Sequence, residues 1–221
     1  MDTSQSDERR RRTIERALNE VRGLDLAEQA RNGGFESQAL AGGGSLLTLS
    51  SFGDRIEIAM PSGEMSMPPL IDSLSLRVLA LRYVKLSCGV SESGEWIAYR
   101  DLPGGRFYAA TLVPTVAQPL ARLFGNKQGA LEEASSRLGG AKADYGDESF
   151  VFHPFPRTPL LLILYRGDEE FAPDCRVLFD RCCSRYLNTD DLKVLATQLA
   201  ADLMKAAGEE GDVENLLWMV E

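Results

Sequence analysis

An uninterrupted apolar run from Leu160 to Tyr165 constrains the fold more than any other feature of this sequence. Its length suits a β-strand and is far short of the roughly 20 residues that a membrane-spanning helix needs. A strand with no polar residue at alternate positions is typical of one that is buried on both faces. The sequence therefore predicts a fully buried strand over 160–165 and no membrane span.

Weaker periodicities predict the elements around this strand. Apolar residues at helical spacing predict helices over 13–21, 70–86, 114–124, 128–138 and 189–207, and the widest apolar face belongs to 70–86. Alternating residues predict a hairpin over 47–60 that turns at Phe52-Gly53, and strands over 95–100 and 149–155. Helices that separate the strands without regular spacing favour an α+β fold, with an antiparallel or mixed sheet packed against several helices.

The length of 221 residues fits one large domain, which we expect over 13–207. Residues 1–12 are polar and are expected to be frayed or disordered. Thr189 is the expected N-cap of the last helix. Residues 208–221 are expected to form an acidic hinge and an apolar tail, which either docks on the domain or contacts a partner.

The formal net charge of −9 argues against binding to nucleic acid, because phosphates repel an acidic surface. The basic run Arg9–Arg12 has no interleaved aromatic residues, so we interpret it as a solvated helix start; a phosphate or anionic-lipid contact is the alternative. No apolar segment near the N-terminus indicates a secretory signal, and the cytoplasm is the expected location.

Cysteine and histidine usage excludes several kinds of site. The four cysteines include no Cys-x-x-Cys pair, and Cys175, Cys182 and Cys183 are expected to be buried thiols rather than metal ligands. His153 is the only histidine, and either it is a backbone-bonded core residue or it serves as a general base or metal ligand. The glycine fingerprints of nucleotide-binding loops and the Gly-x-Ser-x-Gly elbow of hydrolases are absent. The sequence does not identify a cofactor.

Acidic residues follow the buried strand directly. Gly167 leads into Asp168, Glu169 and Glu170, and Asp180 comes shortly after. Carboxylates on a glycine turn at the end of a strand suit the binding of a cation or the activation of water. They suit an exposed turn equally well, so a structural and a functional interpretation both remain open.

Arg100 is the strongest candidate for binding an anion. It ends the strand over 95–100 and lies beside Gly104 and Gly105, whose backbone N–H groups can face a ligand. The structural alternative is a salt bridge from Arg100 to Asp168 or Asp180, and such a pair can itself organise a pocket. We therefore expect Arg100 and these acids to share one cleft.

Several segments together resemble the family of anaerobic bacteria and archaea catalogued as the domain of unknown function numbered 3786. They are Trp96–Gly105, Pro119–Gly125, Leu138–Gly140 with Gly146-Asp147, Phe155–Pro159, Gly167–Phe171, Leu178–Asp180, Tyr186-Leu187 and Asp190–Leu192. Relatives lack an assigned activity, and some are joined to a Cys-rich iron–sulfur domain of the kind found beside corrinoid proteins. This chain has no such domain, so the resemblance implies a partner that supplies the metallocofactor. It adds Asp147 to the candidate residues.

The leading hypothesis is a ligand-binding or accessory module linked to anaerobic corrinoid or iron–sulfur metabolism, rather than an enzyme. Its site would contain Arg100, Gly104, Gly105, Asp147, Asp168, Glu170 and Asp180. One alternative is a metal-dependent enzyme that uses the acids of 168–180 as ligands and His153 as acid or base. The other is a pure interaction protein whose apolar C-terminal tail binds another subunit.

Overall fold

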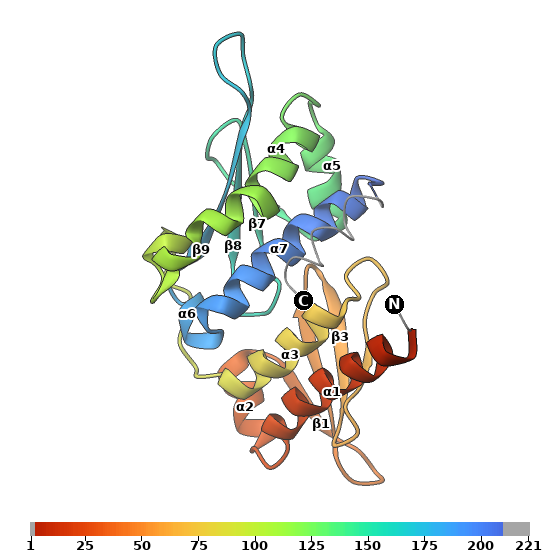
Figure 1. The fold of residues 1–221 in the computed structure, drawn as a ribbon. Coiled ribbons are helices and arrows are strands. Elements are labelled where there is room, and N and C mark those ends of the chain that lie inside the picture. The colour runs from red at the N-terminus through yellow and green to blue at the C-terminus, as the bar shows by residue number, and fades with distance from the viewer. Residues whose placement is uncertain (1–2, 210–221) are drawn as a thin grey trace.

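Two antiparallel sheets and seven α-helices make up the computed structural model, which describes residues 3–209 (Figure 1). The predicted α+β class is therefore confirmed. The strands of the first sheet, in their order across it, are β1 (Glu36–Ala39), β2 (Ser45–Ser51), β3 (Asp54–Met60) and β4 (Glu64–Ser66). Those of the second are β5 (Trp96–Ala98), β9 (Asp174–Asp180), β8 (Leu160–Tyr165), β7 (Glu148–Phe152) and β6 (Ala141–Lys142).

Helices cover one side of each sheet (Figure 1). Those near the first sheet are α1 (Thr3–Val21), α2 (Leu26–Gly33) and α3 (Leu74–Leu86). Those near the second are α4 (Gln118–Phe124), α5 (Ala130–Arg137), α6 (Cys183–Tyr186) and α7 (Thr189–Ala206). Short 3₁₀ turns over 99–111 and a π-helical turn, Val113–Ala117, connect β5 to α4. None of the helices in the described part is long and apolar enough to span a membrane.

Strand β8 is buried as predicted, with only Tyr165 partly exposed. Its neighbours β7 and β9 pair with it on both edges, so its backbone groups are satisfied within the sheet. Leu160, Leu162 and Leu164 belong to the main hydrophobic core. The apolar run therefore forms the central strand of the second sheet.

A close backbone contact joins the two sheets. The Phe52 N–H at the β2–β3 turn donates to the carbonyl of His153, which follows β7, at 2.9 Å. Beside it, Gly53 and Gly139 approach so closely that a Cβ added to Gly139 would lie 2.6 Å from the Gly53 Cα. Helices α3 and α7 meet at the same junction (Figure 1). The two halves are thus packed as one unit.

Tyr83 on α3 fills the other side of this junction. Its ring stacks on Phe155 at 4.9 Å and on Tyr186 at 5.5 Å between ring centroids. Its hydroxyl donates to the Gly33 carbonyl at 2.6 Å and accepts from the Arg157 N–H at 3.0 Å. Burial raises the pKa of this phenol. The buried hydroxyl has both partners that it needs.

Several elements differ from the sequence predictions. Helix α1 begins at Thr3 rather than Thr13, so most of the segment expected to be frayed is helical. Asn188, not Thr189, caps α7 by accepting from the Asp191 N–H, and the Thr189 hydroxyl donates to the Pro103 carbonyl instead. Strand β9 was not predicted. The expected apolar tail, Leu216–Val220, lies outside the described residues.

Candidate functional site

Two adjoining hollows form one groove between the helical segment 113–126 and the chain over 167–176. Their volumes are about 750 Å³ beside the helices and about 500 Å³ beside the β8–β9 loop. Both are lined by Asn126, Ala172 and Pro173, which makes them continuous. We call this feature the α4–β9 groove.

Small side chains on the helical wall leave the space for the groove. Ala117 and Ala121 line it from the π-helical turn and α4, and Val113 lies at the start of this wall with 47% of its surface exposed. Gln118 and Arg122 line the same hollow and supply polar groups on this wall. An apolar wall with polar groups is typical of binding sites.

The end of α4 packs tightly on the opposite wall. A Cβ added to Gly125 would lie 2.3 Å from the Cβ of Pro173. Such a distance is far below van der Waals contact, so only glycine permits this approach. The contact fixes the position of α4 against the chain that leads into β9.

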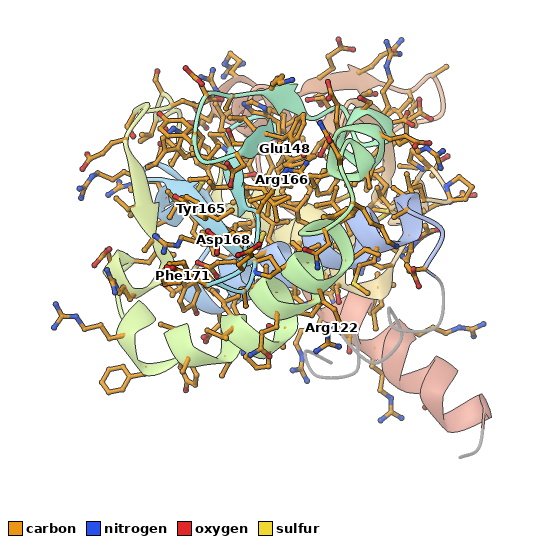
Figure 2. All side chains as sticks on the ribbon, turned by 90° about the horizontal axis from the view of Figure 1, so that it is seen from above. Arg122, Glu148, Tyr165, Arg166, Asp168 and Phe171 are labelled. Carbon is orange, nitrogen blue, oxygen red and sulfur yellow. The ribbon has the colours of Figure 1, made fainter. Side chains whose placement is uncertain are left out.

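A hydrogen-bonded turn shapes the acidic loop over 168–171. The Asp168 Oδ1 accepts from the backbone N–H groups of Glu170 at 2.8 Å and Phe171 at 2.7 Å, and these bonds lower the pKa of Asp168. The Asp168 N–H donates to the Phe171 carbonyl at 2.9 Å. Phe171 remains 69% exposed, near Asp168 in Figure 2. The turn therefore presents an aromatic ring and the Glu169 and Glu170 carboxylates to solvent.

Charged contacts hold the base of the β8–β9 loop. Arg166 forms an ion pair with Glu148 (Figure 2). The backbone N–H of Arg166 donates to the Asp147 carboxylate at 2.8 Å. The Arg176 guanidinium pairs with Asp174 at 3.1 Å and lies 5.1 Å from the centroid of the Tyr165 ring. Asp147 thus acts on the backbone of the loop's first residues.

Arg122 is the cation of the groove that has no ion-pair partner within residues 3–209. It is exposed on α4, and Figure 2 shows it on the opposite side of that helix's ribbon from Asp168. Sequence reasoning did not select it, although it lies within the Pro119–Gly125 segment that carried the family resemblance. An unpaired guanidinium at a groove is suited to bind a carboxylate.

Arg100 does not pair with the acids as expected. Its guanidinium is 3.9 Å from Asp101, and 73% of its side chain is exposed. Neither Asp168 nor Asp180 contacts it among the described residues. The reason is that the chain turns into a 3₁₀ helix at Tyr99, directly after β5, instead of extending along β9. The predicted salt bridge is therefore wrong.

Gly104 and Gly105 form the turn that follows. Gly104 has φ +76°, a value that favours glycine, and a Cβ on Gly105 would lie 1.9 Å from the Tyr99 carbonyl oxygen. Both glycines are thus explained by the path of the chain.

Asp180 is buried and serves as an internal anchor. Its carboxylate accepts from the Ser93 N–H and hydroxyl, the Gly94 N–H and the Cys182 N–H at 2.7–3.1 Å. Burial raises the pKa of this carboxyl, but the hydrogen bonds from Cys182 and Ser93 outweigh that effect and the net pKa is lowered. Asp180 holds the 93–94 loop against the end of β9, outside the groove.

The remaining candidates stand apart. The Cys182 and Cys183 thiols donate to the carbonyls of Arg157 and Pro159, and burial raises the pKa of Cys175, which lines the groove. His153 lies 3.4 Å from Glu92. In the part of the chain that the structure covers, no three His, Cys, Asp or Glu side chains converge as a metal site requires.

The fold and groove define an α+β protein with a candidate binding site at the edge of its second sheet. The chain belongs to the family described as Domain of unknown function (DUF3786), whose model matches residues 25–202. No curated protein and no solved structure matches it. The match begins at Asp25, the N-cap of α2, and therefore leaves out α1.

Proposed function

We propose that the protein is a binding or accessory module that engages a partner protein through the α4–β9 groove. The partner would carry a corrinoid or iron–sulfur cofactor used in anaerobic metabolism. This second part is supported by the family resemblance, because some relatives are joined to a Cys-rich iron–sulfur domain of the kind found beside corrinoid proteins.

The observation that carries the proposal is the combination of the groove with exposed large apolar residues at its ends. Phe171 is 69% exposed at the loop end, and Val113 lies at the helical end. Phe107 and Tyr108, which lie outside both hollows in the turns that precede Val113, are 87% and 49% exposed. Aromatic residues are enriched at protein–protein interfaces, where a few of them supply most of the binding energy. A rim of this kind favours a protein partner over a small ligand.

Site-specific cross-linking tests the proposal. With a photoreactive benzophenone residue in place of Gln118, which lines the groove and is exposed, illumination in extracts of the source cells should give one dominant cross-linked protein. That protein, once purified, should have the absorption spectrum of a corrinoid or an iron–sulfur cluster. The matched control carries the same residue in place of Glu57, an exposed position on β3 of the first sheet.

The same product from Gln118 and Glu57 would contradict a groove-specific partner. A groove-specific product without a metallocofactor would remove the cofactor part of the proposal and leave the binding part.

A further inference from the structure

Resting on the proposed function of the groove, we propose that Arg122 binds a carboxylate of the partner, within a segment that carries opposite charges at its two ends. The acidic end of this segment lies beside α4, and its basic end lies beside Glu169 and Glu170. The groove thereby fixes which way round the segment enters it. Recognition rests on side-chain charges, which set orientation as well as affinity.

A row of polar side chains follows the helical wall of the groove. Its three members are spaced four residues apart, so they lie on one side of the helical segment. They are Gln118, Arg122 and Asn126, and all three are exposed. The neighbouring row, which contains Ala117 and Ala121, is apolar. The wall therefore places its polar groups along one line beside an apolar strip.

The polar row is not used within the described part of the chain. Among residues 3–209, neither the Arg122 guanidinium nor the side-chain amides of Gln118 and Asn126 have a hydrogen-bond or ion-pair partner. A guanidinium has five N–H donors and no acceptor, and each amide adds two donors. The row therefore offers an anion several N–H groups for which no described acceptor competes.

The charges that line the larger hollow favour a carboxylate over a phosphate group. On the wall opposite Arg122, the Arg176 guanidinium is neutralised by Asp174 at 3.1 Å. Arg122 is then the one uncompensated charge among the described residues that line this hollow. A single guanidinium neutralises a carboxylate in a bidentate pair, whereas a phosphate group carries nearly two charges and is commonly bound by several arginines.

The loop end of the groove has the opposite charge. Glu169 and Glu170 line the smaller hollow, are exposed and have no ion-pair partner in the described region. Asp168 lines the same hollow and accepts from the backbone N–H groups of its turn. Figure 2 shows Arg122 and Asp168 on opposite sides of the α4 ribbon. The two signs of charge are therefore separated along one continuous groove.

A segment with the reverse order of charges fits both ends. Its acidic residue meets Arg122, its basic residue meets Glu169 and Glu170, and apolar residues between them pack on Ala172 and Pro173, which line both hollows. A segment of one sign would meet like charge at one end, and like-charge contacts at an interface cost affinity. The groove therefore selects against a uniformly acidic segment, a uniformly basic one and the reversed orientation.

Charge reversal of Arg122 tests the acidic end. The measurement is the affinity of the full chain for the partner captured from Gln118, by isothermal titration at about 50 mM and about 500 mM salt. Arg122→Glu should weaken binding at least tenfold at the lower salt concentration and less at the higher, because repulsion replaces a charge pair. The control Arg55→Glu makes the same change in net charge at an exposed arginine on β3 and should bind like the wild type.

Zero-length cross-linking identifies the partner's group. A carbodiimide joins a lysine amine to an adjacent carboxylate and does not couple a guanidinium, so Arg122→Lys makes the contact detectable. In the complex, position 122 of this variant should be joined to an Asp or Glu of the partner, as read by mass spectrometry after digestion. Position 55 of the control variant Arg55→Lys should not be joined to the partner. Replacing the partner's acid by Arg should then restore the binding of Arg122→Glu.

Charge reversal at the loop end tests the orientation. Glu169→Lys/Glu170→Lys should weaken binding about tenfold, because the basic end of the segment then meets like charge. The control Glu28→Lys/Glu57→Lys makes the same change in net charge at exposed positions away from the groove and should bind like the wild type.

Two results would overturn the inference while the groove keeps its proposed function. One is equal affinity of Arg122→Glu and Arg55→Glu for a partner that Gln118 captures. The other is a captured segment whose basic residue, rather than an acidic one, lies beside position 122. If Gln118 captures no groove-specific partner, the proposed function fails and this inference fails with it.

Discussion

Gly139→Ala should lower the free energy of unfolding by about 4 kcal/mol, the sum of about 1–3 kcal/mol for a left-handed backbone without glycine and a similar amount for overpacking. Gly139 has φ +61°, and an added Cβ would lie 2.6 Å from the Gly53 Cα and 2.9 Å from both the Gly53 N and the Phe52 carbonyl oxygen. These atoms are backbone, so they cannot rotate away as a side chain would. Urea unfolding followed by circular dichroism measures the change.

The matched control for this variant is Gly129→Ala. Gly129 has a similar backbone angle, φ +78°, but nothing lies within 4 Å of an added Cβ. It should therefore lose only the backbone part, about 1 kcal/mol. Equal losses in the two variants would mean that the Gly53–Gly139 contact does not hold the two sheets together.

Asp202→Asn should stabilise the protein above pH 7 by about 4 kcal/mol relative to its effect near pH 4. The Asp202 carboxyl on α7 is fully buried. Its Oδ1 accepts from the Gln198 Nε2 at 2.8 Å and lies 3.4 Å from the Lys205 Nζ, and its Oδ2 has no hydrogen-bond partner in the described chain. Burial raises the pKa of Asp202 to about 7, and the neighbours only partly oppose this.

The sign of the pH dependence follows from the raised pKa. Below about pH 4 the carboxyl is neutral in both the folded and the unfolded chain, so it has no differential effect. Between about pH 4 and pH 7 the unfolded chain ionises while the folded chain stays neutral, and the stability of the wild type falls as the pH rises. Asn has no proton to lose, so the variant lacks this fall.

Urea titrations of wild type and Asp202→Asn between pH 4 and pH 8 test this directly. The difference in unfolding free energy should change with pH mainly below about pH 7. A difference that stays constant across the range would mean that the Asp202 carboxyl is not held neutral.

The regular elements could be predicted from the sequence because their periodicity is strong. The hairpin at Phe52-Gly53 and the helix that ends at Leu86 follow from local pattern alone. Strand β9 has a weaker signal of the same kind, since Cys175 and Val177 alternate with Asp174 and Arg176 before the apolar pair Leu178-Phe179. It was missed because the acids around it were interpreted as a site rather than as the exposed positions of a strand.

The candidate site could be predicted only in part. The sequence indicated that the loop after β8 has unusual chemistry, and Asp168 and Glu170 do line the α4–β9 groove. It could not indicate that Asp180 points inward to the 93–94 loop, because that depends on pairing between β5 and β9, which are far apart in the chain. The groove itself arises from the packing of Gly125 on Pro173, and neither residue carries chemistry that draws attention.

The central claim is that the α4–β9 groove is where a partner binds, and Ala117→Arg tests it most directly. Ala117 is half-buried in the helical wall of the groove and does not belong to the core, so a long charged side chain there fills the space without unfolding the protein. The control is Ala27→Arg, the same change at an exposed helical position on α2 that lies outside the groove and outside the core. The measurement is the affinity of each variant for the partner captured from Gln118, by isothermal titration. We predict that Ala117→Arg weakens binding at least a hundredfold, as expected when the centre of an interface is blocked, while Ala27→Arg binds like the wild type. Unchanged affinity in a folded Ala117→Arg variant would contradict the account.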